Sequence, residues 1–596
     1  MALLAKLAAI LILALQSAPP PAQPSVENKT HESVVTGRTQ SYQVVLPPGY
    51  AASKKRYPVI YWFQGFEQSS AARDAEVASY VAAHDVIVVR TGPADTVGAY
   101  PLYFPELVEI VDKNLRTEAN RDHRAVTGFG MGGFVALWVA GKCPDLVGSA
   151  SSLMGFTEAP VGPAGFELES NLDDLFVNYA GVRTRLSLAK QDALAFYHDR
   201  LNSAWQGTRT GHQSEAFDGD PAAPGVTQTL DFHLHAFANP LPKPAVFSHS
   251  DPYPNFDVWG WEVSSDRRQP GFSVLQNVSS KGFRSSVREW VPGGATIPEV
   301  KISVVSPRIY TPASTVTVTY IRLRDGNVRR AQQKVDAQGR LSFELTGEAF
   351  EVGVSAEPVL TVTGYDIEDA AWATAGKPVK LRIRFSNKGS AKSVAGNIQW
   401  ESVAADVKFE SPASRLFALM PGEAAAIPVS FTAAGPHAMV RIYAVAGGVR
   451  MPIDLPIFPP AEPVTNFHIA DGQAIEVFQH AVRRMEVTLG EGNEDAHAAP
   501  GESFAVLIPD GESYRAAEVF TNDACVDTSV RASDSWAEYD HAGASAKYSL
   551  PSVRAECAPG HVVHMLTRIL LPNHQLKYGA IEFPVWYRKG EEPKGK

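Results

Sequence analysis

This sequence has few cysteines, no excess of positive charge and no long hydrophobic segment beyond its first residues. Three cysteines in 596 residues are too few for a scaffold held together by disulfides. The 64 acidic residues outnumber the 54 lysines and arginines, which gives a formal net charge of -10. This charge disfavours a nucleic-acid partner and an anionic membrane surface, since both favour a basic surface. No later stretch approaches the roughly 20 apolar residues of a membrane span, so we expect none in the mature protein.

The first residues have the pattern of a secretory signal. Lys6 gives a short positive region, residues 7–15 form a brief apolar run, and residues 16–24 are small and proline-rich. The run is too short to span a bilayer, and the prolines that follow disfavour a buried helix. We therefore expect residues 1–22 to be removed and the protein to be exported, to a periplasm or outside the cell.

The length is too great for one hydrophobic core, so several domains are expected. Over residues 38–245, short apolar strands alternate with helices such as 71–83 and 226–238. This alternation is typical of βαβ units, and it predicts a mostly parallel sheet with helices on both faces.

Beyond residue 245, helices become scarce and alternating strands separated by turns take over. We predict a β-rich domain over 246–355, an immunoglobulin-like sandwich over 356–457 and a further β-rich domain over 464–590. The proline-rich stretch 456–463 predicts a stiff linker before the last domain.

Residues 124–137 run from a predicted strand through a glycine cluster into an apolar helix. This is the setting of the nucleophile elbow of α/β-hydrolases, whose pattern is Gly-x-Ser-x-Gly. Gly128 and Gly132 match that pattern, but Gly130 stands at the serine position, and no Gly-x-Ser-x-Gly occurs elsewhere in the chain. A nucleotide site is disfavoured because the Gly-x-Gly-x-x-Gly fingerprint is absent.

At these residues the chain resembles the esterases of the esterase-D and feruloyl-esterase type. Their elbow commonly reads Gly-x-Ser-Met-Gly-Gly and is followed by Ala-Leu on the helix and a Pro-Asp-Leu-Phe-like loop. The matching residues here are 128–133, 136–137 and 144–147. Segments 42–50 and 57–61 are similar to the family's first strand and to the strand before its oxyanion loop. The resemblance covers about residues 38–245, and it implies a carboxylic-ester hydrolase fold.

The resemblance also implies positions for the other catalytic groups. The acid corresponds to Asp192, and the base, normally a histidine, corresponds to Pro221. The oxyanion loop corresponds to Gln64, Gly65 and Phe66, and Met131 follows the nucleophile position.

This set of residues predicts a catalytically degenerate site. Glycine has no side chain to attack a carbonyl, and proline cannot take a proton. An oxyanion hole alone leaves roughly 10³–10⁴-fold acceleration over water. We interpret Ser149, Ser151 and Ser152 as polar residues at a strand end rather than as a relocated nucleophile.

Histidines and cysteines elsewhere predict no metal site. His233 and His235 are an i, i+2 pair on a helix and point to different faces, so we expect solvent-facing or capping roles. Cys525 and Cys557 lie about thirty residues apart in one domain and would pair in an oxidising compartment. Cys143 is then a buried free thiol, with no histidine partner evident for catalysis.

Two further runs have both structural and functional interpretations. Residues 249–262, with Trp290, are rich in aromatics that either seal a domain interface or stack on sugars, and we favour the interface.

The last domain has an acidic, turn-rich run whose spacing matches no EF-hand, so turns and solvation are favoured over calcium. Its residues are Glu518, Asn522, Asp523, Asp527, Asp534, Glu538 and Asp540, around Trp536.

Three functions stay open at this point, and none requires a cofactor. The favoured one is an exported, degenerate esterase that binds a small ester or carbohydrate ligand or acts as a scaffold. The second is an active carboxylic-ester hydrolase with an unidentified nucleophile. The third is an extracytoplasmic polysaccharide or cell-surface binding protein that acts through its β-domains. A fold alone does not choose among them.

Overall fold

The computed structural model describes most of the chain. The described residues are 23–65, 71–93, 100–190, 195–218, 225–480, 483–488, 492–510, 513–516, 518–531, 549–570, 576–588 and 590. The expected signal, residues 1–22, lies outside them. None of the helices in the described part has the length and apolar composition that a membrane crossing needs.

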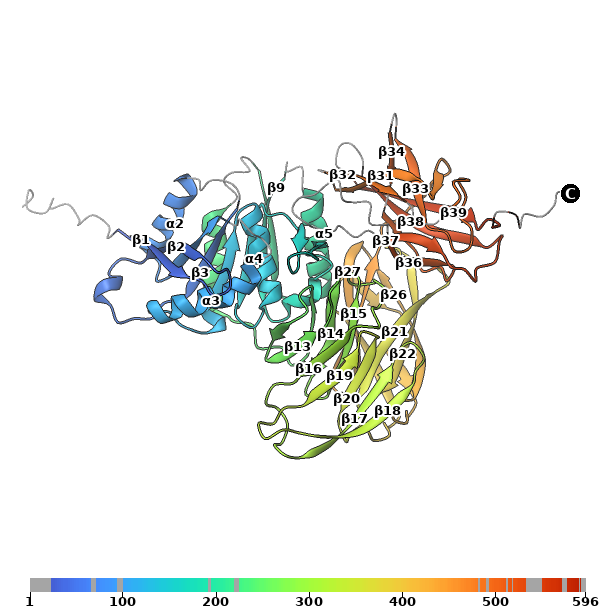
Figure 1. Cartoon of the computed structure of the whole chain (residues 1–596), viewed down its shortest axis with the longest axis horizontal. Helices are drawn as coiled ribbons and strands as arrows, with labels where there is room; N and C mark the ends of the chain where they lie inside the picture. Colours follow the sequence, from blue (N-terminus) through green and yellow to red (C-terminus); the bar gives the residue numbers. More distant parts are fainter. Residues whose placement is uncertain are drawn as a thin grey trace, which may run out of the picture.

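An eight-stranded sheet organises the N-terminal domain (Figure 1). In sheet order its strands are β1 (Ser25–Glu32), β2 (Thr39–Leu46), β4 (Ile87–Pro93), β3 (Val59–Gln64), β5 (Arg124–Gly128), β6 (Ser149–Leu153), β9 (Arg183–Ala189) and β10 (His212–Phe217). Neighbours are parallel from β4 to β10, whereas β2 is antiparallel to both β1 and β4. A small hairpin, β7 (Glu158–Val161) and β8 (Leu168–Asn171), lies outside this sheet.

Helices cover both faces of the sheet, as predicted. The helices are α2 (Ala71–Ala83), α3 (Tyr100–Asn114), α4 (Met131–Lys142), α5 (Ala195–Thr208) and α6 (Val226–Ala238). Val77 of α2 and Leu230 of α6 share one apolar core with the sheet, and α3, α4 and α5 share the core on the opposite face. The central strand β3 is apolar from Val59 to Phe63 because both of its faces are covered.

The domain begins earlier than the sequence indicated. We expected it to start at residue 38, but β1 pairs with β2 along its whole length, from Ser25 opposite Leu46 to Glu32 opposite Thr39. The side chains of β1 are mostly exposed, so this edge strand depends on backbone hydrogen bonds rather than on an apolar pattern.

The second domain consists of two sheets that share one core. The larger sheet contains β11 (Phe247–Asp251), β14 (Phe272–Ser279), β15 (Gly282–Arg288), β20 (Phe350–Val354), β17 (Thr315–Arg322) and β18 (Val328–Lys334). The smaller contains β12 (Phe256–Val258), β13 (Trp261–Ser265), β16 (Lys301–Val305) and β19 (Ser342–Thr346).

The third domain is formed by two four-stranded sheets around one apolar core. One contains β21 (Leu360–Glu368), β22 (Pro378–Asn387), β26 (Ala424–Ala433) and β24 (Val407–Phe409). The other contains β25 (Ala413–Leu416), β23 (Gly396–Ser402), β27 (His437–Ala446) and β28 (Val449–Ile457). The immunoglobulin-like assignment of this sandwich stays a prediction.

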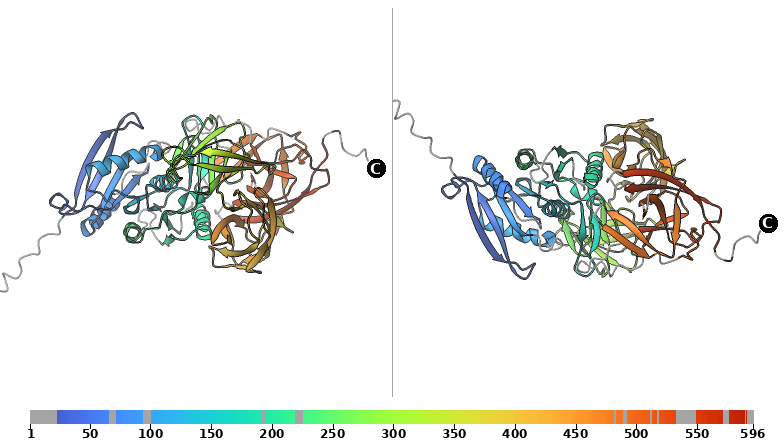
Figure 2. Two further views of the ribbon diagram at one scale, coloured as in Figure 1. Left: turned by 90° about the horizontal axis from the view of Figure 1, so that it is seen from below. Right: turned by 90° about the horizontal axis from the view of Figure 1, so that it is seen from above.

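The last domain contains several small sheets. They comprise β29 (Glu462–Pro463), β39 (Leu576–Pro584), β38 (Val562–Leu570) and β35 (Glu518–Phe520); β30 (His468–Asp471), β33 (Phe504–Asp510) and β34 (Ser513–Ala516); β31 (Ala474–His480) with β32 (Arg483–Thr488); and β36 (Val526–Arg531) with β37 (Ser549–Val553). This domain lies at the end of the molecule opposite β1 (Figures 1 and 2).

The domains are joined by packed contacts. The backbone N–H of Ala438 in β27 donates to Ser203 Oγ in α5 at 2.9 Å, which holds the third domain against the first. The predicted stiff linker is packed where it begins. Phe458 bonds through its backbone to Ala373 and Ala375, and its ring contacts Phe520 at 4.8 Å between centroids. Hydrophobic burial therefore fixes this segment in place.

Candidate active site

The turn between β5 and α4 has the geometry of a nucleophile elbow. Gly130 lies directly before α4 with φ 55° and ψ -124°, a conformation that is strained for any residue with a side chain. Its N–H donates to the Leu153 carbonyl at 3.0 Å, and its carbonyl accepts from the N–H of Gly133 at 3.0 Å. The chain thus turns sharply from strand to helix at Gly130, the residue that the sequence places at the nucleophile position.

The glycines beside this turn allow a close approach of three backbone segments. A Cβ atom on Gly128 would lie 2.7 Å from the Phe63 carbonyl oxygen, and one on Gly132 would collide with that same oxygen. The elbow therefore packs directly against the end of β3, and side chains at these two positions are excluded by backbone atoms.

The predicted oxyanion loop meets the start of α4. Gln64 ends β3, and a Cβ on Gly65 would lie 3.2 Å from the backbone nitrogens of Met131 and Gly132. The first N–H groups of a helix lack intrahelical acceptors and carry partial positive charge. The N–H of Gly132 donates to the Phe129 carbonyl at 2.9 Å, so Met131 supplies the donor beside Gly65. Gln64, Gly65 and Met131 are only half-buried, so this donor lies near the surface. Phe66 lies outside the described residues.

Asp192 and Pro221 also lie outside the described residues, so their predicted roles stay predictions. The strands that lead toward them, β9 and β10, are parallel to each other, with Ala189 opposite Phe217 at their ends. β9 in turn is parallel to β6, and Phe129 bridges to Leu153 of β6. The chain thus leaves β5, β9 and β10 at the same edge of the sheet. This is the edge formed by the carboxyl ends of the strands, where open α/β sheets bind ligands.

His233 is buried rather than solvent-facing, which corrects our expectation. Its Nδ1 is 2.8 Å from Ser149 Oγ, and its Nε2 is 2.8 Å from Ser151 Oγ. Ser151 donates its own proton to Thr127 Oγ1 at 2.7 Å, so Nε2 of His233 donates to Ser151 and Nδ1 accepts from Ser149. Burial, together with the nearby positive charge of Arg185, lowers the pKa of His233 to about 3, so the ring is neutral.

The position of His233 on α6 explains its burial. It lies three residues after Leu230 and four before Phe237, on the face that packs against the sheet. His235 lies on the other face and is exposed, as expected.

The serines of β6 are structural residues of the strand, as expected, but they are buried within it and do not form a polar strand end. Ser149 and Ser151 are fully buried, and Ser152 is 2% exposed. Ser152 Oγ fills the space between Gly133 and Gly155, since a Cβ on Gly133 would lie 2.5 Å from it. None of the three is accessible to a substrate.

Cys143 is a buried free thiol, in agreement with the sequence. Its Sγ lies 3.9 Å from the Pro101 carbonyl, and burial raises the pKa of the thiol to about 12. A thiol with such a pKa is not a nucleophile at neutral pH.

The aromatic run belongs to a domain interface, as favoured from the sequence. Tyr253 is 4% exposed and lies in the core of the first domain, together with Phe272 of β14. Beside it, Lys142 of α4 forms a buried ion pair with Asp251 of β11, at 2.5 Å between Nζ and Oδ2. The other rings of the run, Phe256, Trp259 and Trp261, lie in the core of the second domain. The run therefore spans the boundary between the two cores, and these rings are buried and do not form a sugar-stacking platform.

Cys525 and Cys557 are joined by a disulfide. Within the acidic run, Asp523 is paired with His561. Asp534, Trp536, Glu538 and Asp540 lie outside the described residues.

Part of the first domain is similar to known proteins. Residues 104–218 match the family described as "Putative esterase". An esterase of Mycobacterium tuberculosis is 30% identical over 138 residues, which are 20% of this chain and 30% of that protein. This part of the chain is esterase-like. The esterase-like domain is also similar to an endo-1,4-beta-xylanase/feruloyl esterase of Xylanibacter ruminicola, at 23% identity over 161 residues, which are 23% of this chain and 22% of that protein.

The chain thus spans less than a third of the length of these curated relatives. Among solved structures, a ferulic acid esterase matches at 18% identity with a TM-score of 0.31, over 36% of this chain and 99% of that chain. A fluorophosphonate-binding serine hydrolase of Staphylococcus aureus matches at 15% identity with a TM-score of 0.31, over 36% of this chain and 99% of that chain.

Proposed function

We propose that this protein is an exported pseudo-esterase: its esterase-like domain retains a binding site for a small ester or carbohydrate-linked ligand but does not cleave it. The observation that carries the proposal is Gly130. It has φ 55° and ψ -124° at the strand-to-helix turn where α/β-hydrolases place the nucleophilic serine. Glycine at this point relieves the strain of the turn and removes the attacking atom.

The nearby hydroxyl and thiol groups support this proposal. Ser149, Ser151 and Ser152 are buried. Cys143 is also buried, and its pKa is raised. The neutral His233 has both nitrogens occupied by serines and no carboxylate partner, so it lacks the arrangement of a catalytic base. The sequence assignment of Pro221 to the base position agrees with this interpretation.

Binding without cleavage is chemically reasonable at this turn. The backbone N–H of Met131, the residue after Gly130, begins α4 beside Gly65, whereas the N–H of Gly132 already donates to the Phe129 carbonyl at 2.9 Å. Such a donor as that of Met131 stabilises a carbonyl or carboxylate oxygen whether or not a nucleophile is present. The ligand would therefore carry an acyl or carboxyl group.

Export is proposed from the signal-like first residues and is supported by the disulfide between Cys525 and Cys557. Disulfides persist in oxidising compartments and are rare where thiols are kept reduced.

Labelling with a fluorophosphonate probe tests the proposal. The reagent reacts with activated serines, so we expect no adduct on the mature protein by intact-mass measurement. An active serine esterase serves as the positive control in the same buffer. A stoichiometric adduct mapped to a serine would instead support an active hydrolase with a nucleophile outside the elbow.

A further inference from the structure

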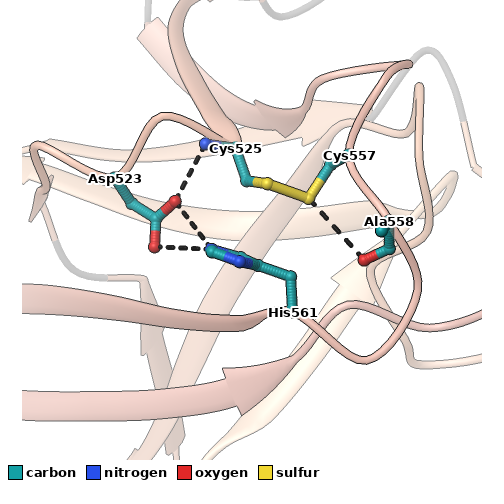
Figure 3. Close-up of a disulfide and its surroundings, with 5 residues drawn as sticks. All are labelled: Asp523, Cys525, Cys557, Ala558 and His561. Carbon is teal, nitrogen blue, oxygen red and sulfur yellow. Dashed lines mark hydrogen bonds and ion pairs between the residues drawn. A yellow bond between two sulfur atoms is a disulfide. The ribbon is translucent and has the colours of Figure 1, made fainter.

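In the last domain, four residues form a cluster around the disulfide (Figure 3). Cys525 precedes β36, Cys557 lies between β37 and β38, and His561 immediately precedes β38. The disulfide joins positions 32 residues apart, with 5.3 Å between the two Cα atoms. Asp523 completes the cluster from the loop before Cys525.

Asp523 holds the imidazole of His561 in a fixed orientation. The Nε2 atom of His561 is 2.9 Å from Oδ1 and 3.0 Å from Oδ2 of Asp523. The carboxylate also accepts the backbone N–H of Cys525 at 2.8 Å, which ties it to the disulfide loop. Because Nε2 donates its proton to Asp523, Nδ1 carries the free lone pair in the neutral ring.

The donor atoms lie close enough together to bind one metal ion. The two sulfur atoms and a ring nitrogen of His561 all lie within 4.8 Å of one another. Zinc sites have bonds of about 2.3 Å to sulfur and about 2.0–2.1 Å to histidine nitrogen, which places neighbouring donors roughly 3–4 Å apart. Rotations of the cysteine side chains therefore suffice to convert the cluster into a coordination site.

We propose that reduction of the Cys525–Cys557 disulfide opens a site for a thiophilic divalent cation of the zinc class. The ligands are the two thiolates and His561 Nδ1, and a water completes the four-coordinate set. Asp523 is a positioning residue: a carboxylate on the far nitrogen of a ligating histidine fixes the tautomer and raises its basicity.

The chemistry balances with a dithiol as the reductant. The dithiol supplies two electrons and two protons, the S–S bond breaks, two cysteine thiols form, and the dithiol becomes a disulfide. Metal binding then releases the two thiol protons, since only thiolates ligate. Each sulfur is in either the S–S bond or a metal bond, so the redox state decides whether the site exists.

Reagents can reach the cluster from solvent. The His561 side chain is 41% exposed and Cys525 is half-buried, whereas the Asp523 side chain is only 8% exposed. The ligand histidine thus forms the accessible side of the site, and its orienting carboxylate lies behind it.

Cobalt(II) titration of the full mature protein tests the proposal. The protein is reduced with dithiothreitol, desalted without oxygen and titrated while thiolate-to-cobalt charge-transfer and tetrahedral d–d absorption are recorded. We expect one cobalt per chain in the reduced protein, displacement by zinc and no binding by the oxidised protein. Absence of the thiolate–cobalt bands from the reduced protein would overturn the proposal.

Variants separate a built site from two incidental thiols. Asp523→Asn should weaken cobalt binding about 10–100-fold, the usual effect of losing such an orienting partner. His561→Ala should weaken it at least as much, and Cys143→Ala, which alters the third cysteine, should leave it unchanged. Unaltered affinity in His561→Ala would contradict the assignment.

Folding is controlled within the same experiment. Both Asp523→Asn and His561→Ala keep the two cysteines, so the disulfide can form in each, and circular dichroism of the oxidised variants verifies their fold before reduction. If the reduced wild-type domain loses near-ultraviolet signal and metal fails to restore it, the proposal is likewise wrong.

Discussion

Two neighbouring parts of the esterase-like domain, the elbow at Gly130 and the buried hydrogen bonds of His233, differ in backbone geometry, reactive groups and solvent access. At the end of β5, the elbow has the backbone conformation of a catalytic turn, yet Gly130 carries no reactive group. One strand away, His233 contacts Ser149 and Ser151, which are residue types that catalysis uses, but all three are fully buried. The first region has geometry without a nucleophile, and the second has reactive groups without access.

The difference shows that residue type and residue environment must coincide before a site can act. A serine–histidine contact on its own is a structural hydrogen bond when burial keeps the imidazole neutral and no substrate can enter. A glycine-framed turn on its own supplies backbone donors but no attacking atom. Variants in the two regions should therefore affect different properties, and stability should respond most strongly to the buried network.

The largest effect is expected for His233→Ala. The substitution leaves a cavity, removes the acceptor of the buried Ser149 hydroxyl and takes one of the two partners of Ser151, which should lower the free energy of unfolding by about 3–5 kcal/mol. Urea denaturation followed by far-ultraviolet circular dichroism measures the loss. His235→Ala, on the exposed face of the same helix, is the matched control and should change stability by less than about 0.5 kcal/mol. Equal effects of the two variants would show that the network contributes little.

Acidification should destabilise this domain through its buried histidines. The pKa values of His233 and His212 are lowered to about 3, chiefly by burial, whereas the unfolded chain has the ordinary histidine pKa of about 6.5. The unfolded state thus binds more protons between these two values. The contribution of these histidines to the free energy of unfolding is fully present above about pH 6.5. Below that pH, the free energy of unfolding falls by about 1.4 kcal/mol per histidine for each pH unit, until the pH approaches 3.

Urea denaturation at pH 7, 6 and 5 measures this slope. His233→Gln should remove one histidine's share of it, because glutamine does not titrate. A variant with the wild-type slope would show that His233 is protonated in the folded protein as well.

Gly132→Ala tests the packing of the elbow frame. The added Cβ collides with the Phe63 carbonyl oxygen, and since both are backbone-fixed, a loss of about 1–3 kcal/mol is expected. Gly49→Ala is no suitable control because Gly49 has φ 73°. Gly396, which has open space around its Cβ position and no positive φ, is the matched site. Equal stability of the two alanine variants would contradict the close approach.

Gly130→Ser should have the smallest effect on stability and the most informative effect on chemistry. A side chain at φ 55° and ψ -124° costs about 1–2 kcal/mol. If Pro221 holds the base position, the introduced serine stays unactivated and the fluorophosphonate does not label it. Rapid labelling of this variant would show that a base survives in the domain and that only the nucleophile was lost.

The sequence predicted those features that depend on local pattern. The alternation of apolar strands and helices gave the parallel sheet, and helices over 71–83 and 226–238 match α2 and α6 at both ends. Gly130 was recognisable because the glycines around it are required sterically at fixed spacing.

What the sequence did not predict depends on tertiary contacts. Strand β1 has no apolar alternation, because only its backbone pairs with β2. The burial of His233 follows from the i, i+3, i+7 apolar face of α6, a signal that was present in the sequence but outweighed by the polarity of histidine. The cluster of Asp523, His561 and the disulfide joins loops that are distant in the sequence.

The most direct test of the account is the rate at which the mature wild-type protein hydrolyses a short-chain aryl acetate. We predict a rate no higher than that of Gly130→Ala at equal concentration, within the residual roughly 10³–10⁴-fold over water that backbone donors alone provide. A wild-type rate well above this, lost on fluorophosphonate treatment, would contradict the account and establish an active esterase.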